Sequence, residues 1–323
     1  MSATSRATSR IEAARGELLA LSHAIHAHPE LGYQEHFSSA AVASAAEQSG
    51  FTLEREAAGL ATAFRATYGT GSMRIALCAE FDALPDVGHA CGHNIIAASS
   101  LGAALGLAEV ADEIDATVIL LGTPSEEGGG GKIDLINAGY FDDVDVAMMV
   151  HPWPTERLEA RCLAVDHFDV VYRGKDAHAS AAPWEGVNAA DALTIAQVSI
   201  GLLRQQLAPG DQVHGFVESG GSAANIIPAR AVGRFMCRSV SAERLAALRV
   251  RVNACFEAGA LASGATLEIV EIGHQFSHMV SDSAVLAHYR VAAEALGRDF
   301  SLDDNGEALP TICLLYTSDA ADE

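Results

Sequence analysis

Basic residues are scarce in this sequence of 323 residues, which has 20 lysines and arginines against 42 aspartates and glutamates and a formal net charge of -22. Such an acidic protein repels nucleic acids and anionic membranes, so we expect neither as a partner. No apolar run reaches the roughly 18 residues that a membrane span needs, and residues 1–10 lack the apolar segment of a signal peptide. We therefore expect a cytoplasmic protein.

Paired cysteines are also missing. The six cysteines lie far apart without a CxxC pair, in a chain long enough to bury a core without disulfides, so we expect them to be reduced. The glycine run at 128–131 has neither the GxxxxGK[ST] nor the GxGxxG spacing of nucleotide-binding loops. Two glutamates precede this run and would repel a phosphate group, which disfavours a nucleotide site.

Short apolar runs alternate with helical patterns in the first half of the chain. Buried strands are predicted over 73–79, 116–122 and 144–150. Apolar residues at helical spacing predict helices over 11–29, 38–48, 95–110 and 133–137. Because strands that alternate with helices usually pair in parallel, we predict an α/β domain with a mostly parallel central sheet.

Residues that can bind a metal follow each of these strands. Cys91 and His93 lie in the segment GHACGHN after the first strand, Glu126 and Glu127 follow the second, and His151 follows the third. Ligands of open α/β sheets bind beyond the carboxyl ends of the strands, so we expect these side chains to converge. Each residue alone has a structural alternative, such as a buried cysteine, a core histidine or a solvated acidic turn. Their combination favours a metal site.

Two further features refine this site. Neighbouring side chains on an extended loop diverge, so one of the two adjacent glutamates can bind metal while the other faces the substrate. We expect His89 and Asp82 to support the ligands or the base rather than to bind metal.

The pattern changes in the second half of the chain to strand, helix, strand, strand, helix, strand, the βαββαβ order of a ferredoxin-like unit. Its predicted elements cover 168–172, 188–207, 213–218, 231–238, 242–262 and 266–272. We predict an inserted domain over 165–275. The first domain is then formed by 1–164 and by 276–312, and a helix over 281–296 returns the chain to it. An exposed sheet edge can be covered by the same edge of a second copy, which favours a homodimer through the inserted domain.

Two polar stretches stand out in this second half. His178 lies in the segment DAHAS and Asn225 in the segment SAANIIP. A surface histidine and a turn asparagine are the alternatives to a functional role, and the residues alone leave both possibilities open.

Five segments follow one another along the chain, namely EFDALP, GHACGHN, GTPSEEGGGGK, DAHASAAPWEGVNAADAL and NIIPARA. Together and in this order, they resemble the metallopeptidase M-20 family of aminoacylases, carboxypeptidase G and N-acyl amino acid amidohydrolases. The resemblance spans about residues 20–310. It looks closest to the branch of Xaa-Arg (β-alanyl-lysine) dipeptidases, aminobenzoyl-glutamate hydrolases and indole-acetyl-amino acid hydrolases. It implies a zinc-peptidase-like catalytic domain that carries an inserted ferredoxin-like dimerisation domain.

The resemblance also implies roles for individual residues. Carried over position by position, it makes Cys91, His93, Glu127 and His151 metal ligands and Glu126 the general base. The implied cofactor is a divalent metal, with two ions per subunit, of zinc or manganese, with cobalt as a further candidate.

In the inserted domain, His178 resembles the histidine that stabilises the tetrahedral oxyanion, and Asn225 resembles the asparagine that helps to hold the substrate. Other branches of the family place a metal-binding histidine where Glu80 stands here, so Glu80 is left out of the predicted ligands.

The end of the chain departs from the family pattern. Family members continue through a further segment that supplies one more metal-binding histidine, and nothing here corresponds to it. Residues 313–323 resemble the translation of a sequencing adapter, so we expect a truncated chain with a non-native tail.

The leading hypothesis is therefore a metal-dependent hydrolase that cleaves the amide bond of a small N-acyl amino acid or dipeptide. The alternative is a non-catalytic, dimeric metal- or ligand-binding protein on the same fold. A zinc deaminase is disfavoured because no PCxxC segment accompanies the histidines.

Overall fold

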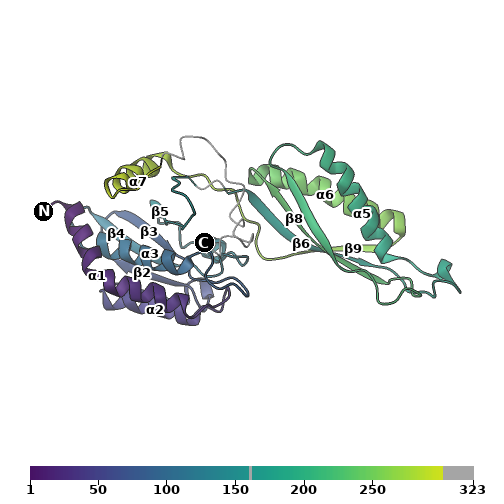
Figure 1. The fold of residues 1–323 in the computed structure, drawn as a ribbon, viewed down its shortest axis with the longest axis horizontal. Coiled ribbons are helices and arrows are strands. Elements are labelled where there is room, and N and C mark those ends of the chain that lie inside the picture. Colours follow the sequence, from purple (N-terminus) through teal and green to yellow (C-terminus); the bar gives the residue numbers. More distant parts are fainter. Residues whose placement is uncertain (160–161, 301–323) are drawn as a thin grey trace. The chain divides into compact units, whose positions relative to one another are not determined.

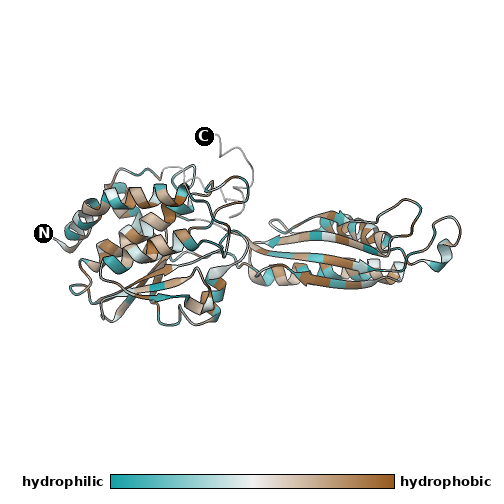
Figure 2. Ribbon diagram, turned by 90° about the horizontal axis from the view of Figure 1, so that it is seen from below, coloured by the Kyte–Doolittle hydropathy of each residue, from teal (hydrophilic) through white to brown (hydrophobic). Residues whose placement is uncertain are grey.

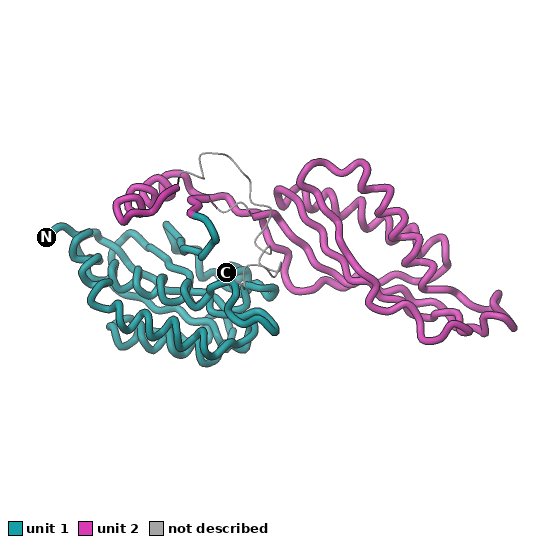
Figure 3. Tube along the Cα trace, viewed as in Figure 1, with its two compact units in different colours: residues 1–155, 313–323 teal, residues 156–312 magenta. Residues whose placement is uncertain are grey.

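The computed structural model describes residues 1–159 and 162–300, which fall into two compact units (Figure 3). Unit 1 comprises residues 1–155, and unit 2 comprises the described residues from 156 onward. The predicted non-native tail and the last residues of the segment 276–312 lie outside the described residues. Within the described part of the chain, no helix combines the length and the apolar character needed to cross a membrane.

A five-stranded sheet forms the middle of unit 1, with the strand order β1-β2-β4-β3-β5 (Figure 1). Its strands are β1 (Thr52–Arg55), β2 (Phe64–Tyr68), β3 (Met73–Ala79), β4 (Ala116–Gly122) and β5 (Val146–Met148). β3 pairs in parallel with β4 and β5, but β2 pairs antiparallel with both β1 and β4. The prediction of a mostly parallel sheet was therefore wrong, because the sheet is mixed. The short connection between β1 and β2 is a physical reason, since a parallel pair needs a crossover of a dozen or more residues.

The helices of unit 1 pack mainly on one face of this sheet. They are α1 (Ala3–His26), α2 (His36–Gln48), α3 (His93–Ala108) and α4 (Gly131–Asn137), with a short 3-10 helix η1 (Ala57–Gly59). Ile25, Val42 and Leu101 of the first three helices share one buried core with Leu77 of β3 and Leu120 of β4. Burying a side chain of this size contributes about 1.5–3 kcal/mol.

The opposite face of β3 and β4 is buried as well. Ala76 and Ile119 alternate with Leu77 and Leu120 along the strands, and they pack against residues that precede β5, such as Phe141. β4 is buried along its whole length, which explains why its sequence is a continuous apolar run rather than an alternating one. The two buried strands hold the loops that follow them at one edge of the sheet.

Unit 2 is built on a four-stranded antiparallel sheet with the order β7-β8-β6-β9. Its strands are β6 (Ala164–Arg173), β7 (Gln212–Ser219), β8 (Arg230–Ser239) and β9 (Thr266–Glu271). Its helices are α5 (Ala189–Leu203), α6 (Ala242–Ser263) and α7 (Ser283–Ala295), with short 3-10 helices η2 (Pro183–Glu185) and η3 (Arg204–Gln206). Along the chain, α5 follows β6 and α6 follows β8, which yields the order strand, helix, strand, strand, helix, strand.

The core of unit 2 lies between its sheet and the helices α5 and α6, and its strands carry both hydrophobic and hydrophilic segments (Figure 2). Phe168, Phe235 and Phe256 form an aromatic group in which the rings of Phe235 and Phe256 lie 4.8 Å apart. The side chain of Asn188 accepts hydrogen bonds from the backbone N–H groups that begin α5, and Ser241 caps α6 in the same way. These caps define where both helices start.

Candidate metal centre

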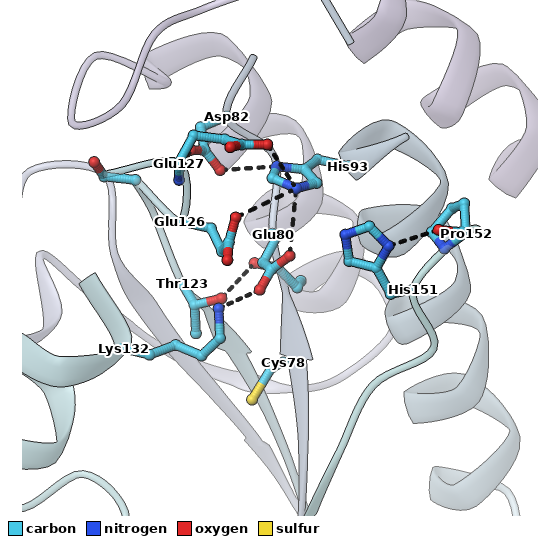
Figure 4. A network of polar contacts seen from close by, with 12 residues as sticks. Cys78, Glu80, Asp82, His93, Thr123, Glu126, Glu127, Lys132, His151 and Pro152 are labelled. Atoms are coloured by element: carbon cyan, nitrogen blue, oxygen red, sulfur yellow. Dashed lines mark hydrogen bonds and ion pairs between the residues drawn. The ribbon is translucent and has the colours of Figure 1, made fainter. Parts of the chain in front are cut away.

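The loops that follow β3, β4 and β5 bring several metal-binding side chains together (Figure 4). Two groups of three residues could each hold a metal ion. In each group, every residue offers one ligand atom, and these atoms all lie within 4.8 Å of one another. One group contains Cys91, His93 and Glu127, and the other contains Glu80, His93 and His151. The structure therefore places the other three predicted ligands, Cys91, Glu127 and His151, around His93.

His93 is the centre of this arrangement and is completely buried. Its Nδ1 is 2.9 Å from Asp82 Oδ1, a hydrogen bond that holds the ring in place. Its Nε2 has no hydrogen-bond partner among the described residues and faces three carboxylates, with Glu80 Oε2 at 3.6 Å, Glu126 Oε2 at 3.8 Å and Glu127 Oε1 at 3.9 Å. A buried imidazole nitrogen that faces several carboxylates offers a set of atoms that can bind a divalent cation, so the residues fit a metal ion.

Asp82 also supports the second loop of the site. Its Oδ2 accepts a hydrogen bond of 2.9 Å from the backbone N–H of Glu127, while Oδ1 holds His93. One carboxylate thus links the residue at the start of α3 to the loop after β4. This is the supporting role that the sequence led us to expect of Asp82.

Gly92 allows the first loop to approach the third. Its backbone has φ = 73°, a left-handed conformation that favours glycine, and Gly92 is the residue just before α3. A Cβ atom at this position would lie 2.9 Å from Pro152 Cγ. A side chain at position 92 would therefore push the segment with Cys91 and His93 away from the segment with His151.

Burial and crowded negative charge shift the pKa values of the site. Burial, with the charge of Glu80, raises the pKa of Glu126 to about 8, and burial also raises the pKa of Glu127. Burial lowers the pKa of His93, but its hydrogen bond to Asp82 and the charge of Glu80 outweigh this effect and raise the pKa to about 9. Ionised carboxylates in such a place repel one another unless positive charge lies between them.

His151 presents its ring to the same place. Its ring is perpendicular to that of His93, with centroids 5.7 Å apart, and its Nδ1 is 2.7 Å from the carbonyl oxygen of Pro152. Because Nδ1 donates to this carbonyl, the lone pair of the neutral ring is on Nε2. Burial lowers the pKa of His151, which favours the neutral form that binds metals. His89 is buried near His26 and belongs to neither group of possible ligands.

The sequence did not reveal that Glu80 faces the metal centre or that it contacts Lys132. Glu80 is 2% exposed, and one of its oxygens pairs with the ammonium of Lys132 while the other faces His93. Glu80 directly follows β3, the same strand-end position that pointed to the other residues. This position was the available signal, but nothing in the sequence reveals that Lys132, at the start of α4, reaches back to it.

His178 and Asn225 lie in unit 2, so their place relative to the metal centre stays a prediction. Both are exposed, and their segments pair with each other. The N–H of Ala179 donates to the carbonyl of Asn225 at 3.0 Å, and the N–H of Ile227 donates to the carbonyl of Ala177 at 2.9 Å. The two polar stretches are thus neighbours in one loop region.

The hydrogen bonds of His178 define its ring chemistry. Nδ1 accepts from the backbone N–H groups of Ser180 at 3.3 Å and Ala181 at 3.2 Å. In the neutral ring the proton is therefore on Nε2, which can donate a hydrogen bond to an incoming group. Ala179 and Ile226, the neighbours of His178 and Asn225, line an open cavity of about 500 Å³ in unit 2.

Comparison with known proteins supplies the context for this geometry. The model of the peptidase family M20/M25/M40 matches residues 76–311. The Xaa-Arg dipeptidase of Mus musculus is 40% identical over 318 residues, which cover 93% of this chain and 73% of that protein. A p-aminobenzoyl-glutamate hydrolase component of Escherichia coli is 31% identical over 279 residues, which cover 80% of this chain and 58% of that protein.

A solved structure shares the fold. The Bacillus subtilis protein described as a dinuclear metal-binding peptidase of family M20 matches with a TM-score of 0.66 and 23% sequence identity. The match covers 89% of this chain and 82% of that protein. At this level of identity the match supports the α/β fold.

Proposed function

Since the chain belongs to the peptidase family M20/M25/M40, we propose that it hydrolyses the amide bond of a small N-acyl amino acid or a dipeptide. The names of its relatives, a dipeptidase and an aminobenzoyl-glutamate hydrolase, support this substrate class. The observation that carries the proposal is the buried Nε2 of His93, which faces three carboxylates and has no hydrogen-bond partner in the part of the chain that the structure describes.

In this proposal Cys91, His93, Glu127 and His151 bind divalent metal, with two ions per subunit. Their thiolate and imidazole groups suit zinc, while the carboxylates also suit manganese, and cobalt is a third candidate. When bound by these residues, a divalent ion would supply a lowered pKa of a water molecule and polarisation of the substrate carbonyl. Asp82 holds His93 in the orientation that presents Nε2 to the ion.

Glu126 is the proposed general base. Its carboxylate takes a proton from the attacking water while the water oxygen bonds to the amide carbon. It then delivers this proton to the amide nitrogen as the carbon–nitrogen bond breaks, which yields a carboxylic acid and a free amine. The position of Glu126 supports this role, because its Oε2 lies 3.8 Å from Nε2 of His93.

Unit 2 completes the proposal. The N–H on Nε2 of His178 donates to the oxygen that becomes negative in the tetrahedral intermediate, and Asn225 helps to hold the substrate. We propose that residues 165–275 are an inserted ferredoxin-like domain, which the strand and helix order of unit 2 supports, and that its exposed edge strand pairs two copies into a homodimer. The proposed location of the protein is the cytoplasm.

The test is hydrolysis of acetylated amino acids and dipeptides by the chain loaded with zinc, manganese or cobalt. We expect Cys91→Ala to lose both bound metal and turnover. Glu126→Gln should retain metal but lose about 10²–10⁴-fold in kcat, the usual contribution of a general base. Full turnover in both variants would refute the proposal. Bound metal without hydrolysis of any compound by the wild type would favour the non-catalytic alternative.

A further inference from the structure

A buried carboxylate outside the metal centre, Glu35, contacts the loop that carries Glu126. Glu35 lies just before α2 and is completely buried. Its Oε1 accepts a hydrogen bond of 2.8 Å from the backbone N–H of Ser125, and its Oε2 accepts one of 2.8 Å from Thr62 Oγ1. Among the described residues neither oxygen pairs with a basic side chain. A carboxylate buried without a countercharge is costly, so its contacts call for an explanation.

The residue that Glu35 holds has an unusual backbone. Ser125 has φ = 54°, a left-handed conformation that is unfavourable for a residue other than glycine. Its carbonyl accepts a hydrogen bond of 2.7 Å from the N–H of Gly130, which closes the turn. A side chain at Gly32 or at Gly129 would overlap Ser125, so the chain packs tightly around this residue from both sides. Such a conformation persists only where its surroundings enforce it.

Glu126 is held on both sides. The N–H of Ser125, the preceding residue, donates to Glu35, and the N–H of Glu127, the following residue, donates to Asp82 at 2.9 Å. Between these two anchors, the side chain of Glu126 points to His93, with its Oε2 3.8 Å from Nε2 (Figure 4). Two buried carboxylates therefore determine the direction of the proposed base.

We infer that Glu35 is a positioning residue for Glu126: by holding the Ser125 N–H, it keeps the turn that aims the Glu126 carboxylate into the site. This inference rests on the function proposed above. Without Glu35 the Ser125 peptide is free to leave its left-handed conformation and carry Glu126 with it. Glu127 keeps its hydrogen bond to Asp82, and Cys91 and His93 belong to a different segment, at the start of α3. Loss of Glu35 should therefore affect turnover more than metal binding.

The experiment compares Glu35→Leu, which cannot accept a hydrogen bond, with Glu35→Gln. The glutamine can still accept from Ser125 through its oxygen and donate to Thr62 Oγ1 through its amide nitrogen. We expect Glu35→Leu to lower kcat by about 10²-fold or more, within the range for loss of a general base, with KM and metal affinity changed by less than about threefold. Glu35→Gln should restore most of kcat. Metal affinity is measured by titration calorimetry on the metal-free protein.

The matched control is Glu30→Ala. Glu30 lies in the same segment, and its carboxylate accepts hydrogen bonds from the N–H groups of Phe37 and Ser38 and from Ser38 Oγ at the start of α2. Its removal disturbs α2 without breaking the bond to Ser125, so kcat should remain near the wild-type value. If Glu35→Leu does not fold, Glu35→Asp replaces it. The shorter side chain of aspartate keeps the charge but is less able to reach the N–H of Ser125.

Two outcomes would overturn the inference. One is a kcat in Glu35→Leu, or in its replacement Glu35→Asp, equal to that of Glu30→Ala. The other is a glutamine variant as slow as the leucine variant, which would assign the effect to the charge of Glu35. Glu126→Gln is measured in parallel. If that variant is fully active, the proposed function fails; if it is inactive while Glu35→Leu is active, only the role of Glu35 fails.

Discussion

His93 of unit 1 and His178 of unit 2 differ in their burial and in their hydrogen bonding. His93 in unit 1 is completely buried, and its Nε2 faces carboxylates but has no hydrogen-bond partner within residues 1–159 and 162–300. His178 in unit 2 is exposed, and its Nδ1 is satisfied by backbone N–H groups. The negative charge of the carboxylates around His93 needs a cation to balance it. The exposed His178 can act only on a group that binds beside it. Two histidines that look equally functional in the sequence are thus suited to different roles.

The largest effect on metal binding and turnover should come from replacing each of these two histidines by alanine. His93→Ala removes the one residue shared by both groups of possible ligands, so we expect bound metal and turnover to be lost together. His178→Ala leaves the metal centre of unit 1 unchanged. It should retain metal and lose about 10²–10³-fold in kcat, as expected for one oxyanion donor. The measurements are metal content by atomic emission and kcat with an acetylated amino acid. Loss of metal in His178→Ala would contradict the division of roles.

A smaller effect tests whether the stability of unit 2 can be changed without affecting the metal centre. Phe256 is completely buried between Phe168 and Phe235, so Phe256→Ala should lower the free energy of unfolding by about 3–5 kcal/mol. Val198→Ala, on an exposed position of α5, should change it by no more than about 0.5 kcal/mol. Denaturant unfolding followed by circular dichroism measures both. At a temperature where Phe256→Ala is folded, its metal affinity should equal that of the wild type, and a weakened affinity would show that the units are coupled.

Much of the fold and of the candidate site could be predicted from the sequence, because the signals lie in short segments of the chain. The apolar runs of β3 and β4 end at the predicted residues, and the resemblance to the peptidase family and the expectation of an enzyme are both confirmed by the family match and by the relatives. The ligand-type residues could be grouped because parallel strands end at one edge of a sheet. Their individual roles stay predictions.

The features that the sequence did not predict depend on contacts between distant segments. β1 was missed because it is a short edge strand with mostly exposed residues, so no apolar period marks it. Glu35 is typical of a solvated turn in the sequence, since carboxylates are seldom buried. Only the fold reveals that it is buried against Ser125, which lies 90 residues further along the chain.

The smallest predicted effect is a dependence of stability on pH that originates in unit 2. Burial, with the nearby positive charge of Arg238, lowers the pKa of His167 below its ordinary value. As pH falls below about 6.5, the unfolded chain binds a proton at this residue while the folded chain does not, so stability is lost as pH falls through the folded pKa and is fully present above 6.5. One such group contributes at most about 1.4 kcal/mol per pH unit. We expect the melting temperature of the metal-free protein to fall less between pH 7 and pH 5 in His167→Gln than in the wild type. Equal changes in the two proteins would show that His167 is protonated as readily in the folded chain as in the unfolded one.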